Sequence, residues 1–265
     1  MAKIGFIGMG NMGYALLKGL LKKFDKEDII FTDVNEDRMK HVYNETGVKY
    51  VLSNSECANS AKYIVFAVKP QFYNDVIKNV VDIITKENII ISIAPGITIE
   101  SLKNRLGFDT RIVRAMPNTP ALVGEGMTGV AYNRSEFNYS EREVIESLFN
   151  SVGKMKFVSE SMMSAVVCAS GSSPAYVYMF IEALADSVVK CGLSRADAYE
   201  FAAQSVLGSA KMVLDTKAHP AILKDMVCSP AGTTIEGVVA LEENGFRNAI
   251  VQATKACYDR AENIK

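Results

Sequence analysis

Short runs of β-branched and apolar residues alternate with segments of helical periodicity through the first half of the chain. The runs occupy residues 4–7, 29–32, 63–67 and 89–93. The helical segments that follow them occupy residues 14–24, 36–44, 73–84 and 99–106. This alternation predicts a parallel sheet with helices on both faces. Further strands at 111–115, 129–132 and 155–158, and a helix at 140–152 started by Ser140, would complete this unit.

The pattern changes near residue 158, where Ala-rich segments at helical spacing replace the β-branched runs. These segments predict helices at 162–169, 175–190, 195–214, 221–227, 235–243 and 246–263. Gly171-Ser172-Ser173-Pro174 is expected to separate the first two of these helices. We therefore predict an α/β chain with two domains, a sheet domain over residues 1–158 and an all-helical domain over residues 159–265.

The composition is that of a globular protein and disfavours two classes of partner. Hydrophobic residues make up 49% of the 265 residues and charged residues 22%, which is enough apolar surface for a core. The 29 Lys and Arg against 30 Asp and Glu leave a net charge of −1, without the basic excess of a nucleic-acid-binding protein. No apolar stretch approaches the roughly 18–20 residues that span a bilayer, so we expect no membrane partner either.

Cysteine and histidine usage indicates the cytoplasm and argues against a metal site. The five cysteines are widely spaced and form no Cys-x-x-Cys pair, which is typical of a reducing compartment. The only histidines are His41 and His219, and no thiolate cluster takes their place as metal ligands. We expect a cytoplasmic protein that binds no metal.

A glycine-rich segment, Gly8-Met9-Gly10-Asn11-Met12-Gly13, lies between the first predicted strand and the first predicted helix. In that context Gly8 would permit a tight turn, Gly10 would let a pyrophosphate approach the backbone, and Gly13 would let helix and strand pack closely. The N–H groups at the start of the helix would bind the phosphates. The segment predicts a dinucleotide site that includes Asn11 and Met12.

The end of the second predicted strand carries the residues expected to meet the adenosine ribose. Asp33 could accept hydrogen bonds from the ribose hydroxyls of NADH and repel a 2′-phosphate, with Asn35 close to it. Arg38 could instead contact the 2′-phosphate of NADPH, so the choice of cofactor stays open. Asp33 or Asn35 could also simply cap the following helix.

Later strand ends would extend the cofactor site along the same edge of the sheet, where ligands of α/β sheets bind. The expected contacts are Val68, Lys69, Pro70, Ala94, Gly96, Pro117 and Asn118.

A second anion site is expected in the helical half, at Ser229-Pro230-Ala231-Gly232-Thr233-Thr234. Small and hydroxyl-bearing residues at a helix start leave N–H groups open to a carboxylate, and the helix dipole favours the negative charge. Plain capping of the helix by Ser or Thr is the alternative.

The whole chain resembles the pyrroline-5-carboxylate reductases. The matching motifs, in order and spacing, are Ile4-Gly5-Phe6-Ile7-Gly8-Met9-Gly10-Asn11-Met12, Ala67-Val68-Lys69-Pro70-Gln71, Arg114-Ala115-Met116-Pro117-Asn118-Thr119-Pro120, Gly171-Ser172-Ser173-Pro174-Ala175-Tyr176, Ser229 to Thr234, and Leu241-Glu242 with Gly245-Phe246-Arg247.

The resemblance implies an N-terminal Rossmann-type domain and a C-terminal helical dimerisation domain of the 6-phosphogluconate-dehydrogenase type. It implies a homodimer, and dimers that can gather into a larger ring such as a decamer. Ser229, Gly232, Thr233 and Thr234 match the residues that hold the substrate carboxylate in the family. The threonine matching Thr234 also faces the ring nitrogen and is the expected catalytic residue.

The implied reaction is hydride transfer from NADPH or NADH to 1-pyrroline-5-carboxylate, giving L-proline in the last step of proline biosynthesis. Asp33-Val34-Asn35 stands where some members carry Asn-Arg or a Ser-rich loop, and Pro95 stands where many have alanine. A hydroxyacid-type dehydrogenase and a nucleotide-sensing module without activity are the alternatives. The first would need a lysine on the first long C-terminal helix, and residues 175–189 contain none.

Overall fold

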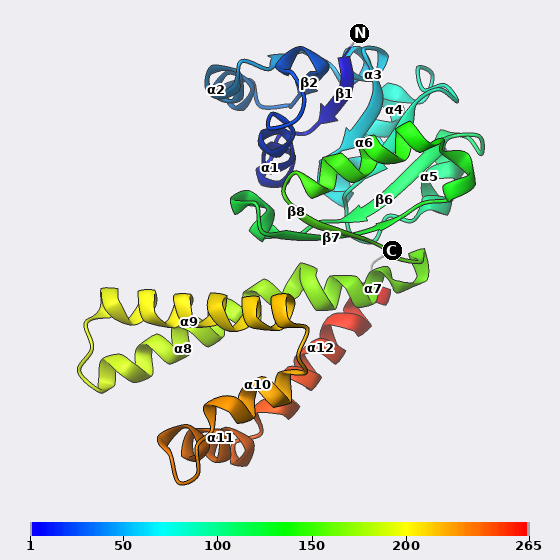
Figure 1. Ribbon diagram of the computed structural model, residues 1–265. Coiled ribbons are helices and arrows are strands. Elements are labelled where there is room, and N and C mark those ends of the chain that lie inside the picture. Colours follow the sequence, from blue (N-terminus) through cyan, green and yellow to red (C-terminus); the bar gives the residue numbers. More distant parts are fainter. Residues whose placement is uncertain (1, 264–265) are drawn as a thin grey trace. The chain divides into compact units, whose positions relative to one another are not determined.

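The computed structural model describes residues 2–263 of the chain. The chain forms two compact units (Figure 1). The first combines Met1–Ser172 with Cys257–Lys265, and the second is Ser173–Ala256. The predicted change from strands to helices near residue 158 coincides with the end of a strand at Phe157, whereas the two units divide after Ser172. A functional boundary at residue 158 stays a prediction.

The first unit is built on one sheet of eight strands in the order β3-β2-β1-β4-β5-β6-β7-β8. All neighbouring pairs are parallel except β6 and β7, which are antiparallel. The strands are β1 Ala2–Ile7, β2 Ile29–Thr32, β3 Lys49–Tyr50, β4 Ala61–Phe66, β5 Ile89–Ser92, β6 Arg111–Met116, β7 Gly126–Ala131 and β8 Gly153–Phe157. The strand order reverses between β1 and β4, which is where α/β sheets place their ligands.

Helices cover both faces of this sheet, as the alternation predicts. They are α1 Asn11–Leu20, α2 Glu36–Thr46, α3 Asn54–Asn59, α4 Tyr73–Val80, α5 Ile99–Leu106 and α6 Tyr139–Asn150. One core cluster joins the sheet to α1, α2 and α6 through Leu16, Met39 and Ile145. A second cluster joins the other face to α3, α4 and α5 through Cys57, Val76 and Leu102.

The sequence patterns missed two short elements and misplaced one cap. Neither β3 nor α3 was expected, because segments of 2 and 6 residues are too short to show a period. The start of α6 is capped by Asn138, whose side chain accepts from the Glu141 backbone N–H at 2.9 Å while Glu141 Oε2 accepts from the Asn138 N–H at 3.1 Å. Ser140 is therefore the second residue of the helix and does not cap it.

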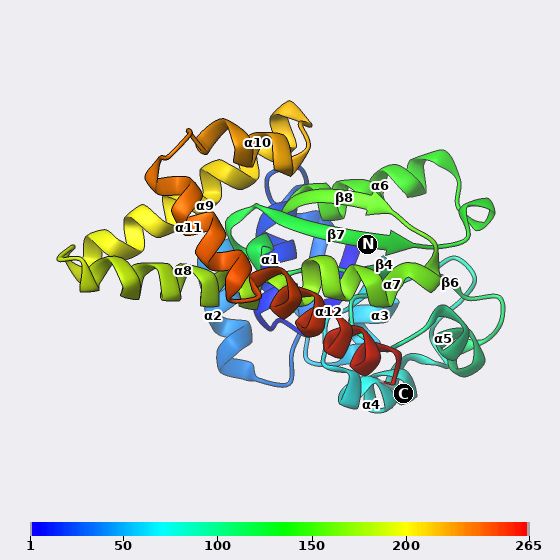
Figure 2. The same cartoon turned by 90° about the horizontal axis from the view of Figure 1, so that it is seen from below.

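The remaining helices are α7 Met163–Val166, α8 Ser173–Lys190, α9 Arg195–Thr216, α10 Pro220–Val227, α11 Thr233–Glu243 and α12 Phe246–Glu262. Ser194 caps α9 by accepting from the Asp197 N–H, as its position predicts. Within the second unit, α8 and α9 lie side by side (Figure 1, Figure 2).

The segment Gly171-Ser172-Ser173-Pro174 does not break the helix. A π-helical turn over Val167–Ser172 connects α7 to α8, so that Glu160–Lys190 runs as one helix of 31 residues. By length and composition alone this helix is long and apolar enough to cross a bilayer. The expectation that no stretch reaches that length is therefore wrong, because it counted the Gly-Ser-Ser-Pro segment as a break.

The second unit has very little interior. Among its described residues, the buried hydrophobic side chains are only Ala185, Ala198 and Ala202. Met179 and Phe201 are 67% and 68% exposed. Several more of its large apolar side chains are exposed, including Tyr178, Leu207, Val227 and Val251.

Candidate functional site

The glycine-rich loop after β1 has the geometry that its three glycines predict. Gly8 has a φ of +97°, and a Cβ there would lie 2.7 Å from the Ala67 carbonyl oxygen. A Cβ on Gly13 would lie 2.5 Å from the Gly8 carbonyl oxygen. A Cβ on Gly10 would meet nothing within 4 Å. Two glycines are thus required by packing, and the middle one leaves its side open to a ligand.

The first turn of α1 offers hydrogen-bond donors at the same place. Gly10 is the N-cap residue of the helix and provides no side-chain hydrogen bond to it. The exposed Asn11 and the half-buried Met12 begin the helix. A helix start with no capping side chain and open space at Gly10 fits the pyrophosphate of a dinucleotide.

Asp33 lies half-buried at the end of β2 and contacts this loop. Its Oδ2 accepts a hydrogen bond from the Met9 N–H at 2.6 Å, and its Oδ1 accepts from the Asn35 N–H at 2.9 Å. Asn35 caps α2 by accepting from the Arg38 N–H at 2.9 Å. Of the two proposed caps, Asn35 serves as one and Asp33 does not.

Arg38 also contacts the loop, through a contact that the sequence did not indicate. Its Nε donates to the Met9 carbonyl oxygen at 2.8 Å, and its guanidinium carbon lies 4.6 Å from the centre of the Tyr14 ring. The Tyr14 hydroxyl donates to Glu45 Oε2, and Glu45 Oε1 lies 3.5 Å from His41 Nε2. Sequence spacing could not predict the contacts of Arg38 and Tyr14, because they join α2 to the loop and to α1, whereas the pair of His41 and Glu45 lies within α2.

The residues after β4 and β5 lie where the sequence places them. Val68 is next to the loop, since a Cβ on Gly8 would come within 2.7 Å of its Cγ1. Lys69 is exposed, and Pro70 begins a short 3-10 segment, Pro70–Phe72. Ala94 is buried, and Gly96 has a φ of +78°.

Beneath this edge, the Tyr73 hydroxyl lies 3.1 Å from the Phe66 carbonyl oxygen and 2.9 Å from Ser92 Oγ. Burial, partly offset by the hydrogen bond to Ser92, raises the pKa of Tyr73 to about 12. A neutral, fully bonded phenol thus fixes the ends of β4 and β5 from below.

Pro117 and Asn118 follow β6 and are both buried. Asn118 donates from Nδ2 to the Ser170 carbonyl oxygen at 3.0 Å and accepts at Oδ1 from the Met127 N–H at 2.8 Å. Its amide thus connects the π-helical turn to β7. Contact of Asn118 with the cofactor stays a prediction, and its side-chain amide already has partners within the chain.

The segment predicted to form the second anion site lies within the helical unit. Gly232 N–H donates to the Ser229 carbonyl oxygen at 3.0 Å, which closes a turn, and Ala231 has a φ of +55°. Gly232 is the N-cap of α11, without a side-chain hydrogen bond to the helix, and Thr233 and Thr234 form the first turn. A Cβ on Gly232 would collide with Ser229 Oγ, so a larger residue there would force the Ser229 side chain to move. The turn gathers Ser229, Gly232, Thr233 and Thr234 at one uncapped helix start.

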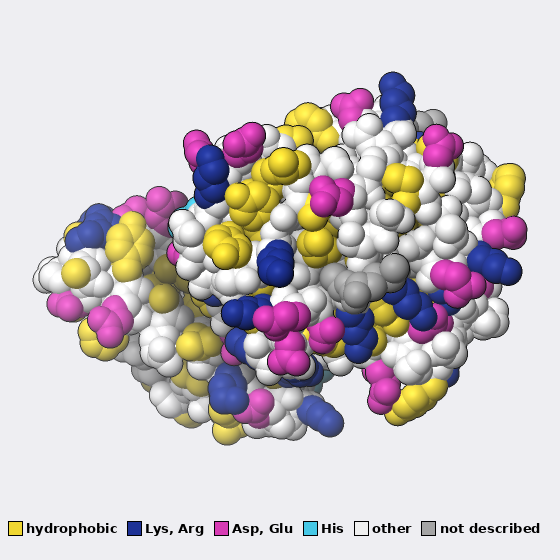
Figure 3. Space-filling view, turned by 90° about the horizontal axis from the view of Figure 1, so that it is seen from above, with side chains coloured by type: hydrophobic (Ala, Val, Ile, Leu, Met, Phe, Trp, Pro, Cys, Tyr) yellow, Lys and Arg dark blue, Asp and Glu magenta, His cyan; other side chains and the backbone are white. Residues whose placement is uncertain are grey.

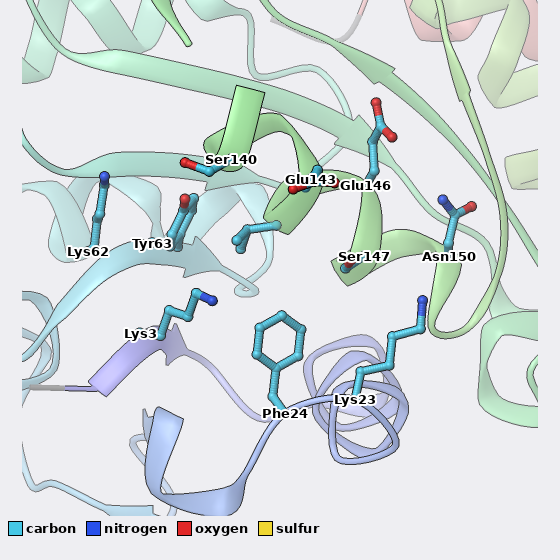
Figure 4. A pocket seen from close by; sticks show the side chains of 11 residues that line it. Lys3, Lys23, Phe24, Lys62, Tyr63, Ser140, Glu143, Glu146, Ser147 and Asn150 are labelled. Atoms are coloured by element: carbon cyan, nitrogen blue, oxygen red, sulfur yellow. The ribbon is translucent and has the colours of Figure 1, made fainter. Parts of the chain in front are cut away.

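A cavity of about 660 Å³ lies at the starts of β1 and β4, whereas the glycine-rich loop follows the end of β1. Figure 4 shows the side chains that line this cavity. Lys3 and Lys62, at the starts of β1 and β4, line it together with Phe24 and residues of α6. It contains none of the predicted site residues.

Glu141 lies beside this cavity and belongs to a partly buried ion cluster. Its Oε1 lies 2.7 Å from Lys62 Nζ and 2.8 Å from Arg111 Nη1. Burial acts against the charged form, but the bonds from Lys62 and Arg111 outweigh it and lower the pKa of Glu141 to about 2. The cluster is structural and joins α6 to the ends of the sheet strands.

The remaining polar surface shows no metal site in the described residues, where no group of three His, Cys, Asp or Glu side chains could hold an ion. Basic and acidic side chains are interspersed on the face shown in Figure 3.

Comparison with known proteins identifies the family of this chain. Residues 3–96 match the family model for NADP oxidoreductase coenzyme F420-dependent, and residues 160–264 match the one for pyrroline-5-carboxylate reductase dimerisation. A pyrroline-5-carboxylate reductase of Escherichia coli K12 is 45% identical over 265 residues, covering 99% of this chain and 98% of that protein.

Solved structures agree over the same extent. A pyrroline-5-carboxylate reductase from Coxiella burnetii has a TM-score of 0.92 at 34% identity, covering 100% of this chain and 98% of that one. The pyrroline carboxylate reductase of Plasmodium falciparum, solved with NADP bound, has a TM-score of 0.89 at 34% identity and covers 99% of this chain and 98% of its own.

Proposed function

The chain belongs to the pyrroline-5-carboxylate reductase family, and from that membership we infer how its residues share the reduction of 1-pyrroline-5-carboxylate to L-proline by NAD(P)H. The observation that carries the inference is the coincidence of full-length similarity with two uncapped helix starts, one at each predicted site.

The cofactor is proposed to lie along the carboxyl edge of the sheet. Gly8, Gly10, Gly13 and the N–H groups of Asn11 and Met12 would hold its pyrophosphate, since Gly10 leaves the space and α1 provides the donors. Val68, Lys69, Pro70, Ala94, Gly96 and Pro117 would line the rest of the site. When bound, the reduced nicotinamide supplies the hydride.

The substrate carboxylate is proposed to bind at the start of α11. The uncapped N–H groups of Thr233 and Thr234 and the Ser229 hydroxyl would hold it, with the helix dipole adding to the attraction. The Thr234 hydroxyl would orient the ring nitrogen and help to keep it protonated. This proposal asks the chain mainly to position an imine that is already electrophilic.

Both histidines have structural partners, which agrees with a reaction that uses no histidine acid. His219 Nδ1 accepts from the Ala221 N–H at 3.2 Å and caps α10. His41 lies on α2 next to Glu45. In addition, the only lysine of α8 is its last residue, Lys190.

We propose that this chain prefers NADH to NADPH. Asp33 presents a carboxylate at the end of β2 whose hydrogen bonds come from backbone N–H groups, so its charge stays available to ribose hydroxyls. The same charge would repel a 2′-phosphate.

We also propose a cytoplasmic homodimer formed through the helical unit, with dimers gathered into a larger ring such as a decamer. The match of residues 160–264 to a dimerisation model supports the dimer. So does the exposure of Met179 and Phe201 in a unit that buries only alanines.

The activity is tested by following the decrease in NADH absorbance when 1-pyrroline-5-carboxylate is added. Proline is then identified chromatographically in the product. A hydroxyacid-type dehydrogenase would instead consume NADH with an oxoacid. A nucleotide-sensing module would bind NADH and consume none.

A further inference from the structure

Two oppositely charged side chains bind the backbone N–H and the backbone carbonyl group of one buried residue in the glycine-rich loop. Asp33 accepts from the Met9 N–H at 2.6 Å, and Arg38 donates from Nε to the Met9 carbonyl oxygen at 2.8 Å. Met9 itself is fully buried. The position of the loop is therefore linked to the position of the Arg38 side chain.

The Arg38 side chain in turn rests on Tyr14. Its guanidinium carbon lies 4.6 Å from the centre of the Tyr14 ring, a distance at which a cation is attracted to an aromatic face. Tyr14 belongs to α1 and directly follows Gly13. Its hydroxyl donates to Glu45, in the last turn of α2, and this bond holds the ring in place under Arg38.

Arg38 is the cation that the sequence offers to a 2′-phosphate after β2, and in this structure it is engaged elsewhere. To use its Nε for a phosphate, the side chain would have to release the Met9 carbonyl oxygen. To turn away from the loop, it would also have to leave the Tyr14 ring. A residue that stabilises the engaged position therefore acts against any phosphate contact that uses Nε or draws the guanidinium away from the loop.

We propose that Tyr14 and Glu45 are positioning residues for cofactor specificity, which act by holding the Arg38 guanidinium on the glycine-rich loop and so disfavour a 2′-phosphate. The proposal rests on the proposed cofactor site at this loop. It does not depend on which cofactor the unaltered protein prefers, because it concerns the change in the ratio of two affinities.

The test compares two probes that differ only in the 2′-phosphate, adenosine 2′,5′-bisphosphate and 5′-AMP. Their dissociation constants are measured by calorimetry on the full chain without substrate. Tyr14→Leu removes the ring and should shift the affinity ratio toward the bisphosphate by about 5–10-fold, the scale of one cation–π contact. Glu45→Gln and Tyr14→Phe keep the ring and should shift the ratio in the same direction by a smaller factor.

Tyr43→Leu is the matched control, since Tyr43 is also a partly exposed tyrosine of this helix pair but packs edge-on against Tyr50. Its affinity ratio should equal that of the unaltered protein. Adding Arg38→Ala to Glu45→Gln should abolish the shift.

An unchanged ratio in Tyr14→Phe and Glu45→Gln would overturn the proposal, even if Tyr14→Leu failed to fold. Equal loss of both affinities would also overturn it, because the residues would then only stabilise the loop. If neither probe bound the unaltered protein, the proposed cofactor site itself would fail.

Discussion

Asn118 donates a hydrogen bond from its Nδ2 to the carbonyl oxygen of Ser170 at 3.0 Å. Ser170 lies in the π-helical turn Val167–Ser172, where the ordinary helical pairing of carbonyl groups is shifted by one residue. The same amide accepts from the Met127 N–H at 2.8 Å. One buried side chain thus joins the end of β6 to β7 and to the turn that leads into α8.

Asn118→Ala should lower the free energy of unfolding by about 1–3 kcal/mol, because it leaves a partly buried N–H and a partly buried carbonyl group without their partner. Urea denaturation followed by circular dichroism measures the loss. Asn133→Ala, at an exposed turn, is the comparison and should cost less. A loss at Asn118 no larger than at Asn133 would show that the amide is replaced by water.

Substitution of two glycines should separate binding from folding. Gly10→Ala adds a methyl group where nothing lies within 4 Å, so the unfolding midpoint should stay unchanged while the dissociation constant for NADH rises at least about tenfold. Gly13→Ala places its methyl group 2.5 Å from the Gly8 carbonyl oxygen and should destabilise the fold. Fluorescence titration and thermal unfolding measure the two effects. Unchanged NADH binding in Gly10→Ala would remove this loop from the cofactor site.

Thr234→Ala should lower kcat/KM by about 10- to 1000-fold, the scale of one oriented hydrogen bond of about 1.5–4 kcal/mol. Steady-state kinetics with 1-pyrroline-5-carboxylate measures it, and Thr234→Ser should recover most of the loss because it restores the hydroxyl. Wild-type kinetics in the alanine variant would exclude Thr234 from the mechanism.

Asp33→Ser should weaken the binding of NADH and strengthen that of NADPH, since it removes the carboxylate proposed to bind the ribose hydroxyls. The ratio of kcat/KM for the two cofactors should shift toward NADPH by about tenfold or more. Because Asp33 also accepts from the Met9 N–H, some loss with both cofactors is expected. Equal loss with both, and no shift in the ratio, would leave Asp33 as a support of the loop alone.

Glu141 should make the stability depend on acid pH. Its pKa is lowered from 4.5 to about 2 in the folded chain, so the carboxylate stabilises the fold above pH 4.5 and this contribution is lost as the pH falls toward 2. Glu141→Gln should be less stable than the unaltered protein at neutral pH, and the difference should narrow on acidification. Urea midpoints at a series of pH values measure it, and a difference that stays constant down to about pH 3 would contradict the assignment.

The correct predictions of this fold were those that depend only on the residues within one segment. The strands 29–32 and the helix 99–106 have their predicted bounds because their periodicity is complete within the segment. The packing roles of Gly8 and Gly13 were also interpreted correctly, because each depends on the immediate turn, whereas the approach of a pyrophosphate at Gly10 stays a prediction. The helix break predicted at the Gly-Ser-Ser-Pro segment was wrong. Those residues usually end helices, but here they lie at a π-helical turn that continues one.

The contacts of Arg38 and Asn118 could not be predicted in the same way. Arg38 meets Tyr14 from another helix, and Asn118 meets Ser170 across 52 positions of sequence. A motif shows which residue types are present near a site, but not whether their hydrogen bonds are already used within the chain. Arg38 and Asn118 were both selected as cofactor contacts, and the structure shows both hydrogen-bonded within the chain.

The helical unit buries Ala185, Ala198 and Ala202 among its described residues and leaves many of its large apolar side chains at the surface. Three methyl groups provide little of the hydrophobic free energy that a unit of this length needs. Under the proposed homodimer, folding of this unit and assembly are one equilibrium, so its unfolding midpoint follows the protein concentration. Dilution alone would therefore be expected to unfold such a unit.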